Sequence, residues 1–173
     1  MNISTPLTKD IVKTLRAGDT VYISGVIYTA RDAAHKKMIE TLEKGGNLPF
    51  DIKDAVIYYA GPCPAKPGEI IGSCGPTTSG RMDAYAPRLI ELGLTGMIGK
   101  GERTDEVYSA MQSCGAVYFG AVGGAGALLA KCVVSVEEIA YPELMSESVK
   151  KLTVKDFPVT VIGDCHGGNL YKR

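Results

Sequence analysis

TVYISGVIYTARDAAHKKMIETL, residues 20–42, has a strand pattern followed directly by a helix pattern. Its first part, residues 20–27, is rich in β-branched side chains and predicts a strand. Its second part, residues 31–42, predicts a helix, because apolar side chains recur at four-residue intervals at Ala30, Ala34, Met38 and Leu42. A strand that leads directly into an amphipathic helix is the repeating unit of α/β folds.

The chain on both sides of this stretch continues the alternation. A short helix is predicted over residues 10–16, whereas the three prolines of residues 61–68 argue against a helix or a central strand there. A helix beginning near Ser79 is predicted by a stripe of apolar side chains at Met82, Tyr85, Ala86, Leu89 and Ile90. Further helices are predicted over residues 102–113 and, after the glycine-rich residues 120–126, up to residue 130. Strands are predicted over residues 55–59, 96–99, 116–119, 132–139, 152–154 and 159–162. This order predicts one α/β domain over residues 1–173 with a mixed sheet.

Composition narrows the class of protein. The 19 basic and 19 acidic side chains cancel, so no basic surface for nucleic acid or an anionic membrane is expected. No apolar run approaches the ~20 residues that span a bilayer, and the charged N-terminus lacks the apolar core of a signal peptide, which predicts a cytoplasmic protein.

The five cysteines include no C-x-x-C pair, so we expect free thiols and no metal site. His35, beside two lysines, is expected to be exposed.

Two segments combine small residues with an arginine at the start of a predicted helix. Arg31 opens the helix that follows the strand at residues 20–27, where free N–H groups favour an anion. The alternative is a surface arginine paired with Asp32 or another acid. In residues 72–83, GSCGPTTSGRMD, the hydroxyls of Thr77 and Thr78 and the guanidinium of Arg81 could converge on one anion. The alternative there is a well-capped helix with an incidental arginine.

A third segment, residues 96–101, places Lys100 between two glycines, as expected either for a ligand-facing ammonium or for a plain turn lysine. It does not match the phosphate-binding P-loop, and residues 120–126 fit the dinucleotide-binding pattern only loosely. Cys165 and His166 are adjacent, but no nucleophile elbow supports a hydrolase dyad. The residues by themselves therefore predict binding of a small polyanion and specify no reaction.

The same segments carry a resemblance to a known family. Residues 24–35, 59–63, 75–83 and 99–101 resemble the β region of class I fumarases and L-tartrate dehydratases, and the similarity runs in order over residues 7–171. The GPTT-x-GRMD motif is its most specific part. The tail at residues 163–171 keeps the family's polar ending, but Cys165-His166 is atypical of it.

The resemblance implies a swivelling β/β/α domain and a split enzyme. It implies a [4Fe–4S] cluster that a separate α subunit holds, with an open iron acting as a Lewis acid, and no metal ligand in this chain. By motif, Arg31 and Arg81 would bind the substrate carboxylates, together with Thr78. Thr77 would be the base that exchanges the C3 proton, and Lys100 would assist it electrostatically.

The resulting hypothesis is the β subunit of an iron–sulfur hydro-lyase that reversibly hydrates fumarate to malate, a reaction of the tricarboxylic acid cycle. We expect a hetero-oligomer, with a homodimer as the alternative for the isolated chain, which would be inactive and expose an apolar docking face. L-Tartrate dehydration is the alternative activity, and an aconitase-like small-domain role is a further rival. A non-catalytic dicarboxylate-binding or assembly module is the alternative from another class.

Overall fold

A computed structural model describes residues 1–121 and 125–172. Its elements, in chain order, are β1 (Asn2–Ser4), α1 (Lys9–Thr14), β2 (Thr20–Thr29), α2 (Asp32–Glu43), β3 (Val56–Tyr58), the 3-10 helix η1 (Ser79–Met82), α3 (Ala86–Glu91), β4 (Gly96–Gly99), α4 (Asp105–Cys114), β5 (Val117–Gly120), α5 (Gly126–Ala130), β6 (Val133–Ala140), the 3-10 helix η2 (Pro142–Glu147) and β7 (Val149–Gly163). Of the glycine-rich residues 120–126, residues 122–124 lie outside the described part of the chain.

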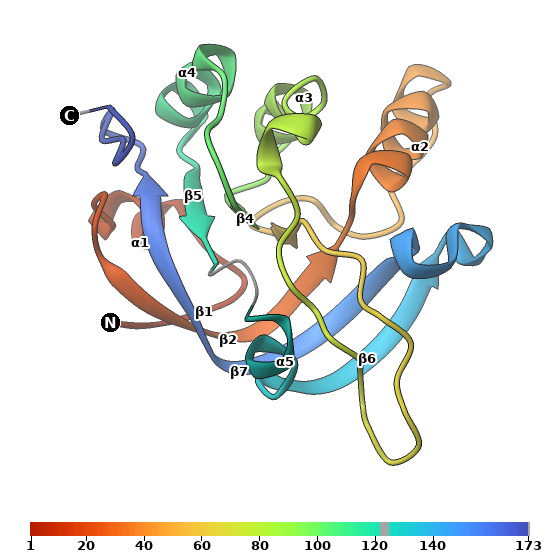
Figure 1. Ribbon diagram of the computed structural model, residues 1–173. Helices are drawn as coiled ribbons and strands as arrows, with labels where there is room; N and C mark the ends of the chain where they lie inside the picture. The colour runs from red at the N-terminus through yellow and green to blue at the C-terminus, as the bar shows by residue number, and fades with distance from the viewer. Residues whose placement is uncertain (122–124, 173) are drawn as a thin grey trace.

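All the described strands belong to one mixed sheet, which confirms the predicted α/β class. The strand order is β1-β2-β3-β4-β5-β7-β6, and β7 also pairs with β2. Strands β1 to β5 run parallel to their neighbours, whereas β7 runs antiparallel to β2, β5 and β6. Because β7 bonds to both β2 and β5, the sheet closes into a small barrel (Figure 1).

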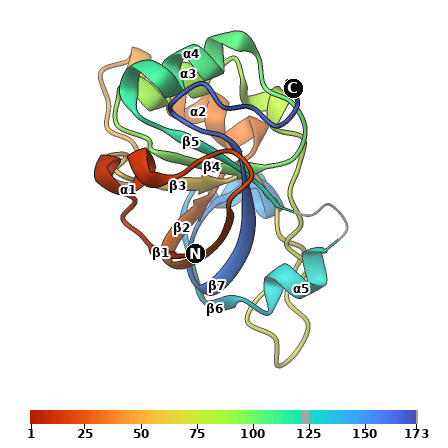
Figure 2. The same ribbon diagram turned by 90° about the vertical axis from the view of Figure 1, so that its left-hand side faces the viewer.

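Two hydrophobic cores lie on opposite faces of this sheet, as the period of two along a strand requires. On β3, Val56 and Tyr58 belong to the cluster inside the barrel. Ile57, with Tyr59 just after the strand, belongs to the second cluster, between the sheet and α2, α3 and α4. These three helices lie side by side over one face of the sheet (Figures 1 and 2). The segment around α1 contributes to the barrel cluster through Leu7, Val12 and Leu15.

The helix predicted to begin near Ser79 is divided into η1 and α3. Pro87 lies in the first turn of α3, and Tyr85 precedes that helix as its N-cap. Proline lacks an N–H and disfavours helical backbone in the preceding residue, so one continuous helix cannot pass through this point. The predicted apolar face is nevertheless buried at Met82, Ala86, Leu89 and Ile90.

The two strands predicted near the C-terminus are parts of one strand, β7. Asp156 has a positive φ of 50°, and the register against β2 shifts between Ile23 and Gly25. Such an irregularity lets one strand carry the turn-like residues Asp156 and Pro158 without ending. The other predicted strands and helices are present with shifts at their ends.

Residues 61–75, where the prolines argued against regular structure, contain no helix or strand. They form a long loop that projects from the barrel beside α5, as both ribbon views show (Figures 1 and 2). Cys63 and Ser73 join the two arms of this loop, because the Cys63 N–H donates to the Ser73 carbonyl oxygen at 2.9 Å. The loop returns the chain to the sheet immediately before the GPTT motif.

Candidate functional site

The predicted site residues gather where the parallel strands end. Arg31 follows β2 and Lys100 follows β4, and both strands run in the same direction as β3 between them. Ligand sites of α/β proteins lie at this carboxyl edge of the sheet. Thr77 is held to the same edge, since its N–H donates to the carbonyl oxygen of Tyr59 at 2.7 Å.

Backbone hydrogen bonds fix the GPTT motif beside Lys100. Thr78 and Lys100 form an isolated parallel β-bridge. The Lys100 N–H donates to the Thr77 carbonyl oxygen at 3.3 Å, and the Ser79 N–H donates to the Lys100 carbonyl oxygen at 2.9 Å. A side chain at Gly99 would collide with the Ser79 hydroxyl, which explains why the approach requires glycine. The structure therefore brings Thr77, Thr78 and Lys100 together, with Thr78 and Lys100 exposed and Thr77 half-buried.

The two arginines lie at the N-cap of α2 and in η1. The Nε of Arg81 lies 2.8 Å from the Asp32 carboxylate, so Arg81 and not Arg31 forms the ion pair with Asp32. Arg31 is half-buried beside Gly61, where an added Cβ would lie 3.0 Å from the guanidinium, and its Nε is 3.9 Å from Glu147. Within the described chain, Arg31 Nε and Asp32 Oδ1 are buried without a hydrogen-bond partner.

His35 is fully buried, so the expectation that it would be exposed is wrong. It lies on the inner face of α2 with Ala34 and Met38, and its ring packs against Tyr59 and Tyr85. Its Nδ1 is 2.8 Å from the carbonyl oxygen of Arg31. Burial, with a smaller contribution from the charge of Arg103, lowers the pKa of His35 to about 4. The imidazole is therefore neutral near neutral pH and supports the backbone of Arg31.

A buried ion pair beneath the loops was missed by sequence reasoning. The side chain of Arg103 is 0% exposed, and its Nε donates to Asp83 Oδ1 at 2.6 Å. The guanidinium also donates to the Tyr59 hydroxyl at 3.2 Å and lies 4.8 Å from the ring centroid of Tyr118. The available signal was weak: Asp83 ends the GRMD motif, and an arginine follows shortly after Lys100.

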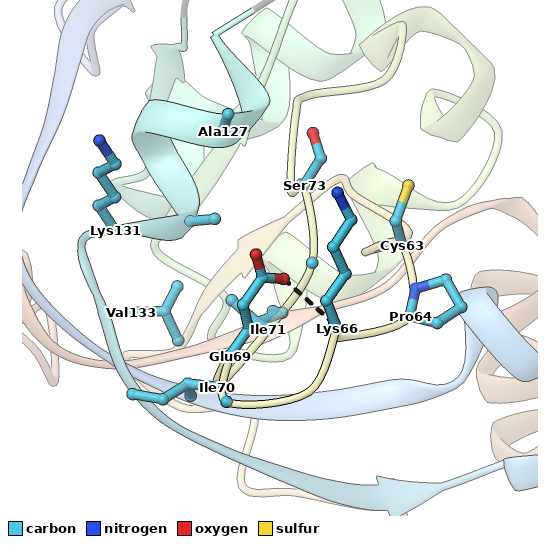
Figure 3. A pocket seen from close by; sticks show the side chains of 13 residues that line it. Cys63, Pro64, Lys66, Glu69, Ile70, Ile71, Ser73, Ala127, Lys131 and Val133 are labelled. Carbon is cyan, nitrogen blue, oxygen red and sulfur yellow. Dashed lines mark hydrogen bonds between the residues drawn. The ribbon is translucent and has the colours of Figure 1, made fainter.

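One hollow of the described surface lies away from these residues. It has a volume of about 670 Å³ and lies between residues 63–73 and the α5–β6 segment. Figure 3 shows Lys66 and Glu69 on one side and Lys131 on the other, and none of the predicted site residues lines it. The candidate site is instead the open edge of the sheet at which Thr78 and Lys100 are exposed.

The thiols and acids do not form a metal site within residues 1–121 and 125–172. No group of three His, Cys, Asp or Glu side chains there could hold an ion, and the five cysteines are free. Cys165 Sγ lies 3.5 Å from His166 Nε2, but burial raises the pKa of the Cys165 thiol, the reverse of what activates a nucleophile. No helix in the described chain is long and apolar enough to cross a membrane.

This edge of the sheet has the chemistry of a dicarboxylate site. Guanidinium groups bind carboxylates with two parallel hydrogen bonds, and Arg31 and Arg81 provide two of them. Lys100 adds an ammonium on the segment that pairs with Thr78. The hydroxyls of Thr77 and Thr78 can donate to a ligand oxygen or exchange a proton with it.

Comparison with known proteins agrees with this chemistry. The family model described as the fumarase C-terminus matches residues 1–173. A Methanocaldococcus jannaschii protein provisionally named L(+)-tartrate dehydratase subunit beta is 42% identical over 173 residues, covering 96% of this chain and 89% of that protein.

Two longer relatives contain the same region. The aerobic class I fumarate hydratase of Escherichia coli K12 is 40% identical over 153 residues, which cover 87% of this chain and 28% of that enzyme. Fumarate hydratase 2 of Leishmania major is 39% identical over 158 residues, covering 90% of this chain and 28% of that enzyme. The chain thus spans little more than a quarter of the fumarate hydratases it matches. By sequence along its whole length, it belongs to the fumarase C-terminus family.

Proposed function

We propose that this chain is the β-type subunit of a two-subunit hydro-lyase that reversibly hydrates fumarate to malate. The observation that carries the proposal is the loop junction at which Thr77, Thr78 and Lys100 are held together by backbone hydrogen bonds. Family membership and the fumarate hydratases among the relatives support the assignment of the reaction.

The arginines bind and orient the diacid. Arg31 and Arg81 each bind one carboxylate of the substrate, and Thr78 donates a further hydrogen bond. Holding both ends of a short diacid fixes the central carbons against the loop junction, which removes much of the entropic cost of the reaction. Asp32 orients Arg81 from the first turn of α2, at 2.8 Å.

Thr77 and Lys100 act at the carbon that gains or loses the proton. In the dehydration direction the deprotonated Thr77 oxygen accepts the C3 proton, the C3–H electron pair forms the C2–C3 double bond, and the C2–O bond breaks. The hydroxide released from C2 takes up the proton from Thr77 and leaves as water; hydration reverses each step. A hydroxyl is a weak base unless its deprotonated form is stabilised. The ammonium of Lys100, whose backbone N–H donates to the Thr77 carbonyl oxygen at 3.3 Å, is assigned that stabilisation.

The second wall of the site is assigned to a partner subunit. The cluster that the family resemblance implies is assigned to that partner. When bound there, a [4Fe–4S] cluster supplies an open iron that acts as a Lewis acid on the substrate hydroxyl. The open edge, and relatives in which the region is a subunit or about a quarter of a longer enzyme, support a partner that closes the site.

L-Tartrate dehydration is the second candidate, because the M. jannaschii protein has a similar length and 42% identity. Tartrate and malate differ by one hydroxyl, so the same arginines would bind either diacid. The preferred substrate is decided by comparing kcat/KM for fumarate, malate and tartrate with one preparation.

Anaerobic co-purification with a candidate cluster-bearing subunit tests the proposal. We expect a stable complex, turnover only in the mixture, and loss of turnover without loss of assembly in Thr77→Val. A Thr77→Val complex with normal rates would remove Thr77 from the mechanism. Tight dicarboxylate binding by the isolated chain, with no activity in any mixture, would favour a non-catalytic binding module instead.

A further inference from the structure

We propose that Arg103, with Asp83, is a positioning residue of this site, which sets the separation between Thr77 and Lys100. The inference rests on the function proposed above, in which those two side chains act on the substrate. Neither Arg103 nor Asp83 reaches the open edge, because their side chains are 0% and 6% exposed.

Stability alone does not account for this pair. Bringing two charges out of water costs several kcal/mol each, and well-packed apolar side chains of similar volume often stabilise a core equally well or better. Here the guanidinium is enclosed between aromatic rings, 5.2 Å from the centroid of Tyr59 and 4.8 Å from that of Tyr118. A charged pair at such a position is better explained by the geometry that its directional hydrogen bonds impose.

The pair joins the segment that follows η1 to the segment that follows β4. Asp83 accepts a hydrogen bond from Arg103 Nε through one carboxylate oxygen and from the Thr104 N–H, at 2.7 Å, through the other. Arg103 also donates to the hydroxyl of Tyr59, whose carbonyl oxygen accepts from the Thr77 N–H. A displacement of the Arg103 guanidinium would therefore shift both the segment that contains Thr77 and the segment that contains Lys100.

The neighbouring tyrosine makes a second connection between the same segments. The Tyr118 hydroxyl lies 2.7 Å from the Gly101 carbonyl oxygen, to which it donates, and 2.8 Å from the Ser79 hydroxyl. Ser79 in turn donates its N–H to the carbonyl oxygen of Lys100 at 2.9 Å. Arg103, Asp83 and Tyr118 thus form a buried support under the exposed residues Thr78 and Lys100.

Arg103→Lys in the complex with the cluster-bearing subunit is the main test. Lysine keeps the charge but lacks the planar fork that reaches Asp83 and Tyr59 together. We expect kcat to fall by about 10- to 100-fold, because small misplacements of catalytic groups cost about that much. KM should change by less than about threefold, because Arg31 is positioned independently by α2.

Two further variants separate positioning from folding. Tyr118→Phe removes only the hydroxyl link, so we expect kcat to fall by about three- to tenfold and Tm to fall about as much as in the control below. This variant decides the question if Arg103→Lys does not fold. Thr95→Val is the matched control, because it removes another buried hydrogen bond, from the Thr95 hydroxyl to the Leu7 carbonyl oxygen at 2.6 Å. It should lower Tm and leave kcat unchanged.

The outcomes distinguish this inference from the proposed function. An active wild-type complex whose Arg103→Lys and Tyr118→Phe forms keep the wild-type kcat would overturn the positioning role alone. A fall in kcat that Thr95→Val reproduces would also overturn it, since the effect would then follow stability. A wild-type complex inactive toward fumarate, malate and tartrate would overturn the proposed function and this inference with it.

Discussion

Tyr58 and Tyr59 are consecutive and fully buried, yet they belong to two different environments on opposite faces of the sheet. Tyr58 lies inside the barrel, where its ring packs edge-on against Phe157 at 5.2 Å and its hydroxyl donates to the Cys74 carbonyl oxygen. Tyr59 faces the helices, where its ring contacts His35 and its hydroxyl accepts a hydrogen bond from Arg103.

The difference separates the part of the molecule that holds the fold from the part that supports the site. The barrel cluster is apolar, and its burial is the main stabilising term. The helix-covered face includes a neutral imidazole and a buried ion pair directly beneath the open edge. Substitutions on the first face should change stability, and substitutions on the second should change stability and the site together.

Phe157→Ala, on the barrel face, is expected to cause the largest loss of stability. Phe157 is fully buried, and truncating a buried aromatic side chain to alanine costs about 4 kcal/mol. Urea unfolding of the isolated chain measures the loss, with the exposed Leu128→Ala as the control that should change stability by less than about 0.5 kcal/mol. A loss below about 1 kcal/mol would mean that the barrel interior is not the main source of stability.

Asp83→Asn should produce a somewhat smaller loss of stability on the helix face. Asparagine still accepts from the Thr104 N–H but leaves the Arg103 charge buried without a counter-ion, which costs about 3 kcal/mol. The same urea experiment measures it. Unlike Phe157→Ala, Asp83→Asn should also lower the activity of the complex that remains folded. Full activity per folded Asp83→Asn complex would contradict the separation of the two faces.

The elements of the fold could largely be predicted because their signals are local. The β-branched run of β2 and the four-residue spacing of α2 identify a strand and a helix from neighbouring residues alone. Closure of the sheet could not be predicted from such local signals. It depends on β7 pairing with both β2 and β5, a long-range contact for which periodicity contains no signal.

The candidate site likewise has features that local sequence patterns predict and features that they do not. The glycine and hydroxyl pattern around Thr77 and Lys100 predicted two candidate site segments, and the structure brings their backbones together. The burial of His35 was not predictable from its lysine neighbours, because it depends on which face of α2 meets the sheet. Arg103 was missed since a buried arginine is recognisable only once its partner, Asp83, is placed beside it.

His35 gives the helix face a pH dependence that the apolar barrel lacks. Its pKa is lowered from 6.5 to about 4 by burial, so between these values the unfolded chain binds more protons than the folded one. Stability should therefore fall as the pH falls from about 6.5 toward about 4, and this one group accounts for about 2 kcal/mol between pH 6.5 and pH 5. The nearby charges of Arg103 and Asp32 act in opposite directions on His35.

Urea unfolding of wild type and His35→Gln at about pH 6.5 and about pH 5 measures this contribution. The variant should be less stable near pH 7 but lose less stability on acidification. Thr95→Val is the control, because it removes a buried hydrogen bond without removing a titratable group and should leave the acid-induced loss unchanged. Equal losses in wild type and His35→Gln would show that the imidazole is not neutral and buried in the folded chain.

The smallest effect on stability is expected at the surface, from Asp32→Asn. Asp32 pairs with Arg81 at 2.8 Å, but the arginine side chain is 53% exposed, so the pair contributes less than about 1 kcal/mol. The main effect of Asp32 is instead to orient Arg81 toward a substrate carboxylate. In the reconstituted complex, KM should rise by about threefold with kcat nearly unchanged, as expected when ground-state binding is weakened.

Asp105→Asn offers a closely matched control for this last prediction. Asp105 also begins a helix, α4, and also forms an exposed ion pair, with Lys172 at 2.6 Å, but the pair lies away from the loop junction. Both substitutions should cost similarly little stability, and only Asp32→Asn should change KM. A lower KM in Asp32→Asn would mean that Asp32 competes with the substrate carboxylate for Arg81, so that the pair seen without substrate must open before the diacid binds.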